Sequence, residues 1–326
     1  MFGLPAVRAG SVVVNVATST ALIGREAMRR SRGWLMAGAI ITSAALALTG
    51  CANNTESSGP GTSTTAVKPG KVDEIANLLP DKIKQSGKVI VGTDPTYKPN
   101  EYKDPNGKII GFDVDLLNAV AAVLGVTPDY RESGFDNIIP SIQGGSFDMG
   151  MSSFTDNKKR EEQVDFVDYF EAGSLWTQRP GSPIDPNNAC GLKVAVQTAT
   201  VQDTDELPAK NQACVQAGKP GINVLKFPGQ DAATNAVMVG QADAMTADYP
   251  VTVAAIKDSG GKLEQAGQLF KTAPYGWAIQ KGSPLGRALL KALENVMQTG
   301  GYKTILANWS VQDGAIDKAS INGAVS

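Results

Sequence analysis

Arg160 and Asp248 are charged side chains that each follow a predicted strand, where they could bind a small charged ligand. An arginine guanidinium can donate two parallel hydrogen bonds to a carboxylate, and an aspartate can pair with a cation. Polar and aromatic residues follow the other predicted strands in the same way: Asp94, Tyr97, Phe135, Ser152, Ser153, Gln197, Thr198, Thr200 and Gln230. Ligands of parallel α/β sheets bind beyond the carboxyl ends of the strands, so we expect these side chains to line one cleft.

Together these residue types match the groups of a free α-amino acid. Arg160 could bind the ligand carboxylate, with further donors from hydroxyls and helix amino-terminal amides near Ser153 and Thr200. Asp248 could bind the ammonium group, and the two aromatic residues could enclose the aliphatic part. Asp94 could pair with a basic side chain or accept a hydrogen bond from an amide. The sequence therefore predicts a polar amino acid, and glutamine, glutamate, asparagine, lysine and arginine all stay open.

Each of these residues also has a purely structural interpretation. Arg160 lies in the charged run 158–162, and such runs are usually solvated helix faces. Asp248 could cap the helix that follows it, and aromatic residues belong more often to the core. Ser153 could satisfy neighbouring backbone groups. The functional hypothesis therefore depends on the whole set of residues.

A regular alternation of strands and helices is predicted in the first half of the chain. Strands at Lys88–Thr93, Val126–Tyr130 and Phe147–Met151 alternate with helices at Phe112–Leu124 and Asp136–Gln143. Apolar residues share one face of the first helix, and a glycine directly follows it, as is common at a helix end. This order is that of a parallel, doubly wound unit.

The same order returns in the second half of the chain. Strands are predicted at Leu192–Val196, Asn223–Phe227 and Ala242–Thr246, with helical segments within Gln202–Ala217 and at Ala232–Val239. The repetition predicts an α/β fold with two doubly wound parallel-sheet lobes.

The C-terminal part of the chain is expected to return to the first lobe. A strand at Tyr275–Gln280 precedes a helix that starts at Ser283, and neither has a lobe of its own to join. The expected domains are a first lobe of residues 71–180 plus 274–326 and a second lobe of residues 181–273.

Two connections between lobes would form a double-crossover hinge. The first is expected in the Gly- and Pro-rich segment Trp176–Pro186, with a crossing near Gln178–Ser182. The second crossing is expected near Thr272–Gly276. Such a hinge would allow a ligand to bring both lobes together.

The N-terminal residues read as an export signal followed by a lipid attachment site. Arginines within residues 29–32 precede the apolar run Trp34–Leu48, which is shorter than the ~20 residues of a membrane-spanning helix. The run ends in Leu-Thr-Gly-Cys51, the pattern of a lipobox, although a short anchor helix with an incidental cysteine is the alternative. We expect residues 1–50 to be leader and signal peptide. Residues 51–70 would form a flexible tether, lipidated at Cys51, on the outer face of the cytoplasmic membrane.

Composition excludes several kinds of site and partner. The chain has no histidine and three cysteines, so His-based catalysis is excluded and neither a metal nor a cofactor is expected. With Cys51 lipidated, Cys190 and Cys214 can form a disulfide in an exported protein, or else remain two buried thiols. The net charge of −2 indicates no nucleic-acid partner and no membrane contact besides the lipid. We expect a monomer.

Several stretches of the chain resemble the family 3 extracellular solute-binding proteins, the polar amino-acid receptors of ABC importers. They include Val91-Gly92-Thr93-Asp94-Pro95-Thr96-Tyr97, Gly111-Phe112-Asp113-Val114-Asp115-Leu116 and Phe135-Asp136-Asn137-Ile138-Ile139-Pro140. The resemblance implies a type II periplasmic-binding-protein fold, the Venus flytrap, and delivery of ligand to an ABC-transporter permease. It also implies amino-acid contacts at Asp94, Tyr97, Phe135, Ser153, Arg160, Thr200 and Asp248. Ala199 and Val201 stand where the family more usually has glycine or hydroxyl residues.

Three classes of function fit this resemblance. A transport receptor is the leading hypothesis, because paired sites for ammonium and carboxylate favour binding over reaction. The alternatives are a dehydratase-type enzyme on the same scaffold, with carboxylates as acid and base, and the sensor subunit of a signalling system. We expect the protein not to be an enzyme.

Overall fold

The computed structural model describes residues 67–181 and 183–325. The predicted signal peptide, Cys51 and most of the predicted tether lie outside these residues. Within the described part of the chain, no helix is both long and apolar enough to cross a membrane.

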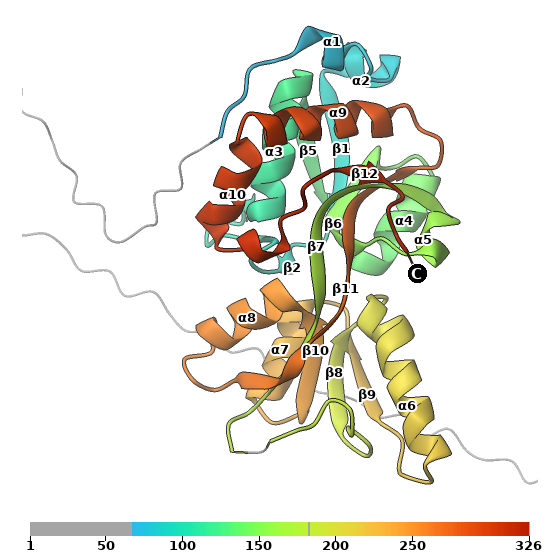
Figure 1. Ribbon diagram of the computed structural model, residues 1–326, viewed down its shortest axis with the longest axis vertical. Helices are drawn as coiled ribbons and strands as arrows, with labels where there is room; N and C mark the ends of the chain where they lie inside the picture. Colours follow the sequence, from blue (N-terminus) through green and yellow to red (C-terminus); the bar gives the residue numbers. More distant parts are fainter. Residues whose placement is uncertain (1–66, 182, 326) are drawn as a thin grey trace, which may run out of the picture. The chain divides into compact units, whose positions relative to one another are not determined.

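The first lobe, by which we mean residues 67–172 and 273–325, is built on a sheet in the order β5-β1-β6-β11 (Figure 1). Strands β1 and β5 are parallel, as are β1 and β6, whereas β11 is antiparallel to β6. The strands are β1 (Lys88–Thr93), β5 (Thr127–Glu132), β6 (Met149–Thr155) and β11 (Glu264–Gln280), and the main helices are α3 (Phe112–Leu124), α4 (Phe135–Gln143) and α9 (Leu285–Gln298).

Helices cover both faces of this sheet, because alternate residues of each strand point to opposite faces. In β11, Trp277 belongs to the large core formed with α3 and α9, whereas Ala278 packs in a separate cluster with α4. Helix α3 ends at Gly125, whose φ of 68° lies in the left-handed region that terminates helices without steric cost in glycine. The first lobe is therefore the doubly wound unit that the sequence predicts.

The second lobe, residues 174–181 and 183–270, repeats this plan on a smaller scale. Its parallel strands are β8 (Lys193–Gln197), β9 (Asn223–Phe227) and β10 (Ala244–Asp248), and its helices are η1 (Gln202–Glu206, a π-helix), α6 (Leu207–Gln216), α7 (Gln230–Met238) and α8 (Tyr249–Asp258). One core cluster lies under α6 and another under α7. The predicted disulfide Cys190–Cys214 ties the segment before β8 to α6.

Two long antiparallel strands join the lobes (Figure 1). In strand β7 (Val164–Gln178), residues up to Ala172 pair with the first-lobe part of β11, and residues from Ser174 pair with β10. In β11 the pairing register shifts between Phe270 and Ala273. The chain thus already lies in the second lobe at Ser174, four residues before Gln178.

The prediction that Trp176–Pro186 forms the first connection is wrong at its start. Trp176 is fully buried within β7 and belongs to the second-lobe core. The glycines and prolines that suggested a linker begin only after Gln178, beyond the end of the strand. An apolar run that crosses from one lobe to the other looks in sequence like an ordinary strand of one lobe.

Short elements complete the described chain. They are α1 (Asp73–Ala76), α2 (Asp81–Ser86), β2 (Thr96–Tyr97), β3 (Glu101–Lys103), β4 (Ile109–Ile110), α5 (Lys158–Glu161), α10 (Gly301–Trp309), η2 (Gln312–Gly314) and β12 (Ser320–Ile321). Strands β2, β3 and β4 form a separate small sheet, and β12 pairs with β7.

Candidate ligand-binding site

A small pocket lies where residues of both lobes meet, at the carboxyl ends of β1, β6, β8 and β10. The space between its lining atoms, open solvent included, is about 280 Å³. The lining residues are Asp94, Tyr97, Phe135, Ser152, Ser153, Thr155, Arg160, Gln197, Thr200, Val201, Gln202 and Asp248. Residues that the sequence spreads over 155 positions therefore meet at one place.

Two of the residues noted from the sequence do not line the pocket. Thr198 donates a hydrogen bond from its hydroxyl to the Phe227 carbonyl, at 3.1 Å, in its own lobe. Gln230 donates its backbone N–H to the hydroxyl of Thr96, at 3.1 Å, and so joins the two lobes beside the pocket.

Arg160 is held by the turn that carries it. The side chain of Asn157 caps α5 by accepting a hydrogen bond from the Arg160 backbone N–H at 2.8 Å. The guanidinium donates from Nη1 to the Thr155 carbonyl at 2.7 Å, and from Nη2 to the Ala199 carbonyl of the second lobe at 3.0 Å. Two of its five N–H donors are used by these bonds, which leaves donors for a ligand.

The environment of Arg160 differs from that of its charged neighbours. Arg160 is 9% exposed, and its guanidinium carbon lies 5.5 Å from the ring centroid of Phe135. Burial lowers the pKa of Arg160 to about 10, so the side chain stays charged at neutral pH. Lys158, by contrast, has a side chain 56% exposed and pairs with Glu161 at 2.9 Å. Arg160 is therefore not part of a solvated helix face.

Asp248 ends β10 and precedes α8 without capping it through its side chain. Its carboxylate instead accepts hydrogen bonds from the Tyr97 hydroxyl, at 2.8 Å, and from Gln202 Nε2, at 2.7 Å. Burial raises the pKa of Asp248, while the positive charge of Arg160 acts in the opposite direction. Of the acidic groups around Arg160, Asp248 acts most strongly on its pKa. The two opposite charges thus line the same pocket.

Asp94 is the second buried carboxylate of the pocket. It accepts hydrogen bonds from the Thr96 hydroxyl at 2.8 Å, the Phe135 backbone N–H at 3.1 Å and Gln197 Nε2 at 2.9 Å. Burial raises its pKa, and these hydrogen bonds act to lower it. The bond from Gln197 crosses between the two lobes.

A layer of buried acid supports the first-lobe wall of the pocket. The Ser152 hydroxyl donates to Glu101 Oε1 at 3.1 Å, and the Ser153 hydroxyl lies 3.0 Å from Asp113 Oδ2 and 3.1 Å from Glu101 Oε2. Burial raises the pKa of Asp113 to about 6 and that of Glu101 well above its usual value. Each of these two adjacent buried carboxyl groups therefore disfavours ionisation of the other.

Three lining residues were not foreseen, namely Thr155, Val201 and Gln202. Gln202 is the most consequential, because its side-chain amide donates to both Asp248 and the Ser174 hydroxyl. It lies in the π-helix η1, where the sequence suggests only an ordinary helical segment. A π-turn changes which side chains face a site, and no pattern in one sequence announces it.

Comparisons with known proteins agree with this geometry. Residues 89–312 match the sequence profile of the bacterial extracellular solute-binding proteins, family 3. The chain belongs to this family. Its structural neighbours and its mixed α/β sheet show the type II periplasmic-binding-protein fold that the sequence predicts.

Relatives of this solute-binding protein are named for the amino acids that they bind. It is 38% identical to the arginine-binding protein ArgT of Corynebacterium glutamicum over 86% of this chain and 93% of that one. It is 30% identical to the ABC transporter glutamine-binding protein GlnH of Bacillus subtilis, over 78% and 91% of the two chains.

Solved structures give the same picture. An ancestral arginine-binding protein bound to arginine is 34% identical, with a TM-score of 0.63 over 68% of this chain and 98% of that one. An ancestral amino acid-binding protein described as a precursor of cyclohexadienyl dehydratase is 32% identical, with a TM-score of 0.61 over 72% and 99%. The named relatives are binding proteins, and one neighbour lies on a lineage that leads to an enzyme.

Proposed function

We propose that this protein is an extracytoplasmic receptor that captures a cationic amino acid, such as arginine or lysine, and delivers it to an ABC-transporter permease. The observation that carries the proposal is the charge inventory of the pocket. Its charged lining residues are two carboxylates, Asp94 and Asp248, and one guanidinium, Arg160. The carboxylate and ammonium of any amino acid would neutralise Arg160 and Asp248, leaving Asp94 without a counter-charge.

A cationic side chain would complete this arrangement. A buried carboxylate that has hydrogen bonds but no counter-ion is costly, which agrees with the raised pKa of Asp94. The guanidinium or ammonium of the ligand would pair with Asp94 and favour its ionised form. In the same proposal, Tyr97 and Phe135 enclose the aliphatic part, and Ser152, Ser153, Gln197 and Thr200 shape the polar walls.

The proposed mechanism is closure of two lobes about a hinge. The crossings would lie at Ala172–Ser174 in β7 and at Phe270–Ala273 in β11, where pairing passes from one lobe to the other. A ligand bound by Arg160 from one lobe and Asp248 from the other favours the closed arrangement by its differential affinity. Small-angle scattering with saturating arginine should then give a smaller radius of gyration than without it.

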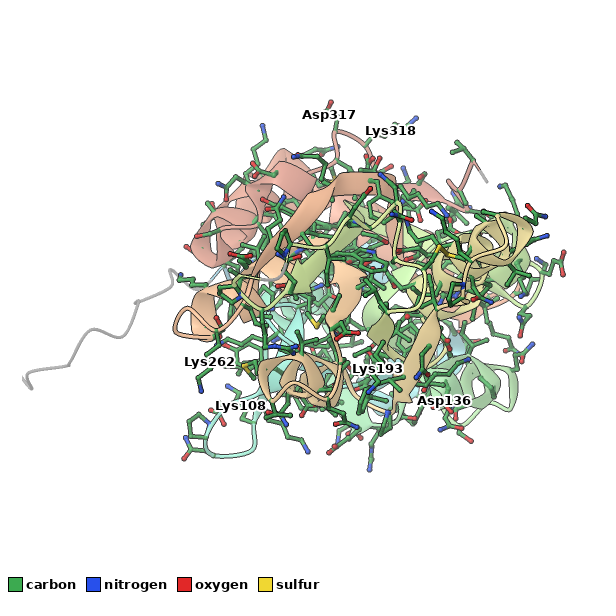
Figure 2. All side chains as sticks on the ribbon, turned by 90° about the horizontal axis from the view of Figure 1, so that it is seen from below. Lys108, Asp136, Lys193, Lys262, Asp317 and Lys318 are labelled. Carbon is green, nitrogen blue, oxygen red and sulfur yellow. A yellow bond between two sulfur atoms is a disulfide. The ribbon has the colours of Figure 1, made fainter. Side chains whose placement is uncertain are left out.

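We propose that the protein acts outside the cytoplasm on a lipid anchor at Cys51. The support comes from the lipobox and from the extracellular character of the family. Both walls of the site come from one chain, so we propose a monomer. We also propose that it does not act as an enzyme. Figure 2 shows charged side chains of both signs at the outside of the fold, including those of Lys108, Asp136, Lys193, Lys262, Asp317 and Lys318. Because charges of both signs are mixed there, we propose that the protein has no nucleic-acid partner.

Calorimetric titration with L-arginine, L-lysine, L-glutamine and L-glutamate tests the ligand class. Arginine or lysine should bind most tightly to the unaltered protein. Asp94→Asn should weaken binding of the cationic ligands at least tenfold, because their side-chain charge would be left unpaired. It should change glutamine binding little. Tighter binding of glutamine or glutamate than of arginine by the unaltered protein would refute the cationic specificity.

A further inference from the structure

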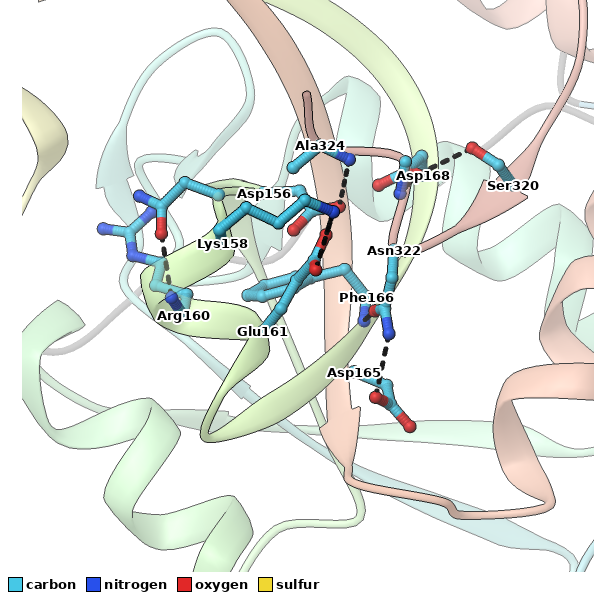
Figure 3. Close-up of polar contacts among 12 residues, drawn as sticks. Asp156, Lys158, Arg160, Glu161, Asp165, Phe166, Asp168, Ser320, Asn322 and Ala324 are labelled. Atoms are coloured by element: carbon cyan, nitrogen blue, oxygen red, sulfur yellow. Dashed lines mark hydrogen bonds and ion pairs between the residues drawn. The ribbon is translucent and has the colours of Figure 1, made fainter. Parts of the chain in front are cut away.

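The C-terminal segment, residues 320–325, lies against the turn that carries Arg160. After η2 the chain returns along the first lobe, and β12 pairs with β7, Ser320 opposite Asp168 and Ile321 opposite Val167. Figure 1 shows the C-terminus beside α5, and Figure 3 shows the polar contacts that fix it there. The solute-binding hypothesis uses none of these contacts.

Two buried aspartates receive hydrogen bonds from this segment. Asp168 Oδ2 accepts from the Ser320 hydroxyl at 2.7 Å and from the Gly323 backbone N–H at 2.9 Å. Asp156 Oδ2 accepts from the Ala324 backbone N–H at 3.2 Å. Both aspartates are almost fully buried, with 1% and 2% of their surfaces exposed.

The two carboxyl groups also contact each other. They are within hydrogen-bonding reach, and within the described part of the chain the Oδ1 atom of each accepts no hydrogen bond from a donor group. The charged groups around them are Glu161, which pairs with Lys158, and Asp165, which lies 3.8 Å from Lys281 Nζ. Among the described residues, no cation pairs with either member of this acid pair. A proton on one carboxyl group would allow it to donate a hydrogen bond to the other.

Asp156 stands between the two groups that hold Arg160. Thr155, directly before it, accepts from the guanidinium through its carbonyl, and Asn157, directly after it, accepts from the Arg160 backbone N–H. A displacement of Asp156 would therefore move both supports of Arg160. The hydrogen bond from Ala324 to Asp156, together with those that hold Arg160 in its turn, therefore links the C-terminal segment with the proposed carboxylate site.

We propose that residues 320–325 act as a clasp that positions Arg160 for ligand binding by holding Asp156 and Asp168 together. This inference rests on the proposed function, because Arg160 must bind the ligand for its position to affect affinity. Ser320, Asp156 and Asp168 are then positioning residues that do not touch the ligand. The clasp explains why a segment far from the pocket in sequence is ordered against two buried acids.

The clasp should make the affinity for ligand depend on pH in one direction. Burial and the neighbouring charge of Asp168 raise the pKa of Asp156 to about 7. Below that pH, a protonated Asp156 donates to Asp168. Above it, two carboxylates repel each other and only the donors of the C-terminal segment hold them. The affinity for ligand should therefore fall as the pH rises through about 7.

Titration of the full chain with L-arginine from pH 6 to 8.5 provides the test. Ending the chain at Ala319 should weaken binding by about 2- to 30-fold, the range for residues that act without touching a ligand. The side-chain amide in Asp156→Asn can donate to Asp168 at every pH. This variant should therefore keep the ligand affinity seen at pH 6 and show no fall in affinity at higher pH. Ser320→Ala removes a hydrogen-bond donor that lowers the pKa of Asp168, so in this variant the affinity for ligand should fall at a higher pH. Lys318→Ala, an exposed change just before this segment, is the matched control and should behave as the unaltered protein.

Hydrogen exchange of residues 156–161 without ligand separates the clasp from the proposed function. Exchange there should be faster in the shortened chain and should rise with pH more steeply in the unaltered protein than in Asp156→Asn. If arginine does not bind but this pattern is found, the clasp stands and the proposed ligand is wrong. An unchanged exchange pattern, or an Asp156→Asn variant with the full pH dependence of binding, overturns the clasp. If the shortened chain does not fold, Ser320→Ala and Asp156→Asn still decide.

Discussion

Each wall of the pocket contains a non-glycine residue in the left-handed backbone region, and the two are held in opposite ways. Ser153 in the first-lobe wall has φ 49°, and Ala199 in the second-lobe wall has φ 65°. The Ser153 hydroxyl lies within hydrogen-bonding distance of Glu101 and Asp113 and accepts from Asn100 Nδ2 at 2.8 Å. Ala199 has no polar side chain that could compensate its conformation. Ser153 is thus held through its own side chain, whereas Ala199 is held through its backbone, whose N–H donates to Asp203 Oδ2 at 3.0 Å.

This difference indicates that the two walls of the pocket have different roles in binding. Behind the first wall lie the buried acid layer and the largest hydrophobic core of the described chain. The second wall is a loop held by bonds among its own residues, such as that from the Thr200 hydroxyl to the Gln197 carbonyl at 2.8 Å. We infer that the first lobe presents a preorganised surface and that the second lobe adapts to the bound ligand. The predictions below test this contrast, from the largest expected effect to the smallest.

The largest effect is expected where the two walls contribute charge. Arg160→Ala and Asp248→Ala should each weaken arginine binding by ~2–5 kcal/mol, because one ligand charge would be buried without a partner. That range corresponds to roughly 30-fold to several-thousand-fold in Kd. Calorimetry measures both variants, with Lys158→Ala as the exposed control from the same turn. Loss of binding in Lys158→Ala equal to that in Arg160→Ala would show that the turn has been assigned wrongly.

Removal of the disulfide should affect the second lobe alone. Cys190 and Cys214 are 24 residues apart, so on the chain-entropy account the cross-link stabilises the fold by ~3–4 kcal/mol. Cys190→Ser with Cys214→Ser should lower the free energy of unfolding by that amount in a urea titration, with arginine still bound at saturation. A stability equal to that of the unaltered, oxidised protein would argue against the cross-link.

The sequence predicted those helices and strands that follow from periodic patterns of apolar residues. The bounds of β1, α3 and β9 agree with the predicted elements residue for residue, because each is a short apolar pattern closed by polar or glycine residues. Nine of the twelve pocket-lining residues followed from one rule, that residues placed after parallel strands converge at one edge of the sheet. The long crossing strands, the π-helix and the contacts of the C-terminal segment could not be predicted, since each depends on pairing between residues far apart in sequence.

The buried acid layer of the first wall should make stability depend on pH. The pKa of Asp113 is raised by burial to about 6 in the folded chain from 3.8, so the folded state binds this proton more tightly than the unfolded state. Its contribution is complete below pH 3.8 and is lost as the pH rises through about 6. The loss should be on the order of 1–3 kcal/mol. Asp113→Asn should flatten the change in unfolding free energy between pH 4 and 7.5, and an equally steep variant would refute this account.

The smallest effect is expected at Ala199, and it tests the contrast between the walls directly. A left-handed backbone conformation costs a residue with a Cβ atom about 1–2 kcal/mol, whereas glycine adopts it freely. Glycine also loses more backbone entropy on folding, so Ala199→Gly should raise the free energy of unfolding by only about 0.5–1 kcal/mol. Ala213→Gly, in an exposed interior position of α6, is the matched control and should lower it by about 1 kcal/mol.

Ser153→Gly completes this comparison. It relieves the same kind of backbone strain but removes a hydroxyl bonded to Asn100 and within reach of the buried acids. Leaving those buried groups unpaired costs about 1–3 kcal/mol, so this variant should be destabilised although Ala199→Gly is stabilised. Arginine binding should be nearly unchanged in Ala199→Gly, since its carbonyl still accepts from Arg160. Urea titration of the three glycine variants measures the signs. Equal signs at residues 153 and 199 would remove the distinction between a strained residue held by its own side chain and one held through its backbone.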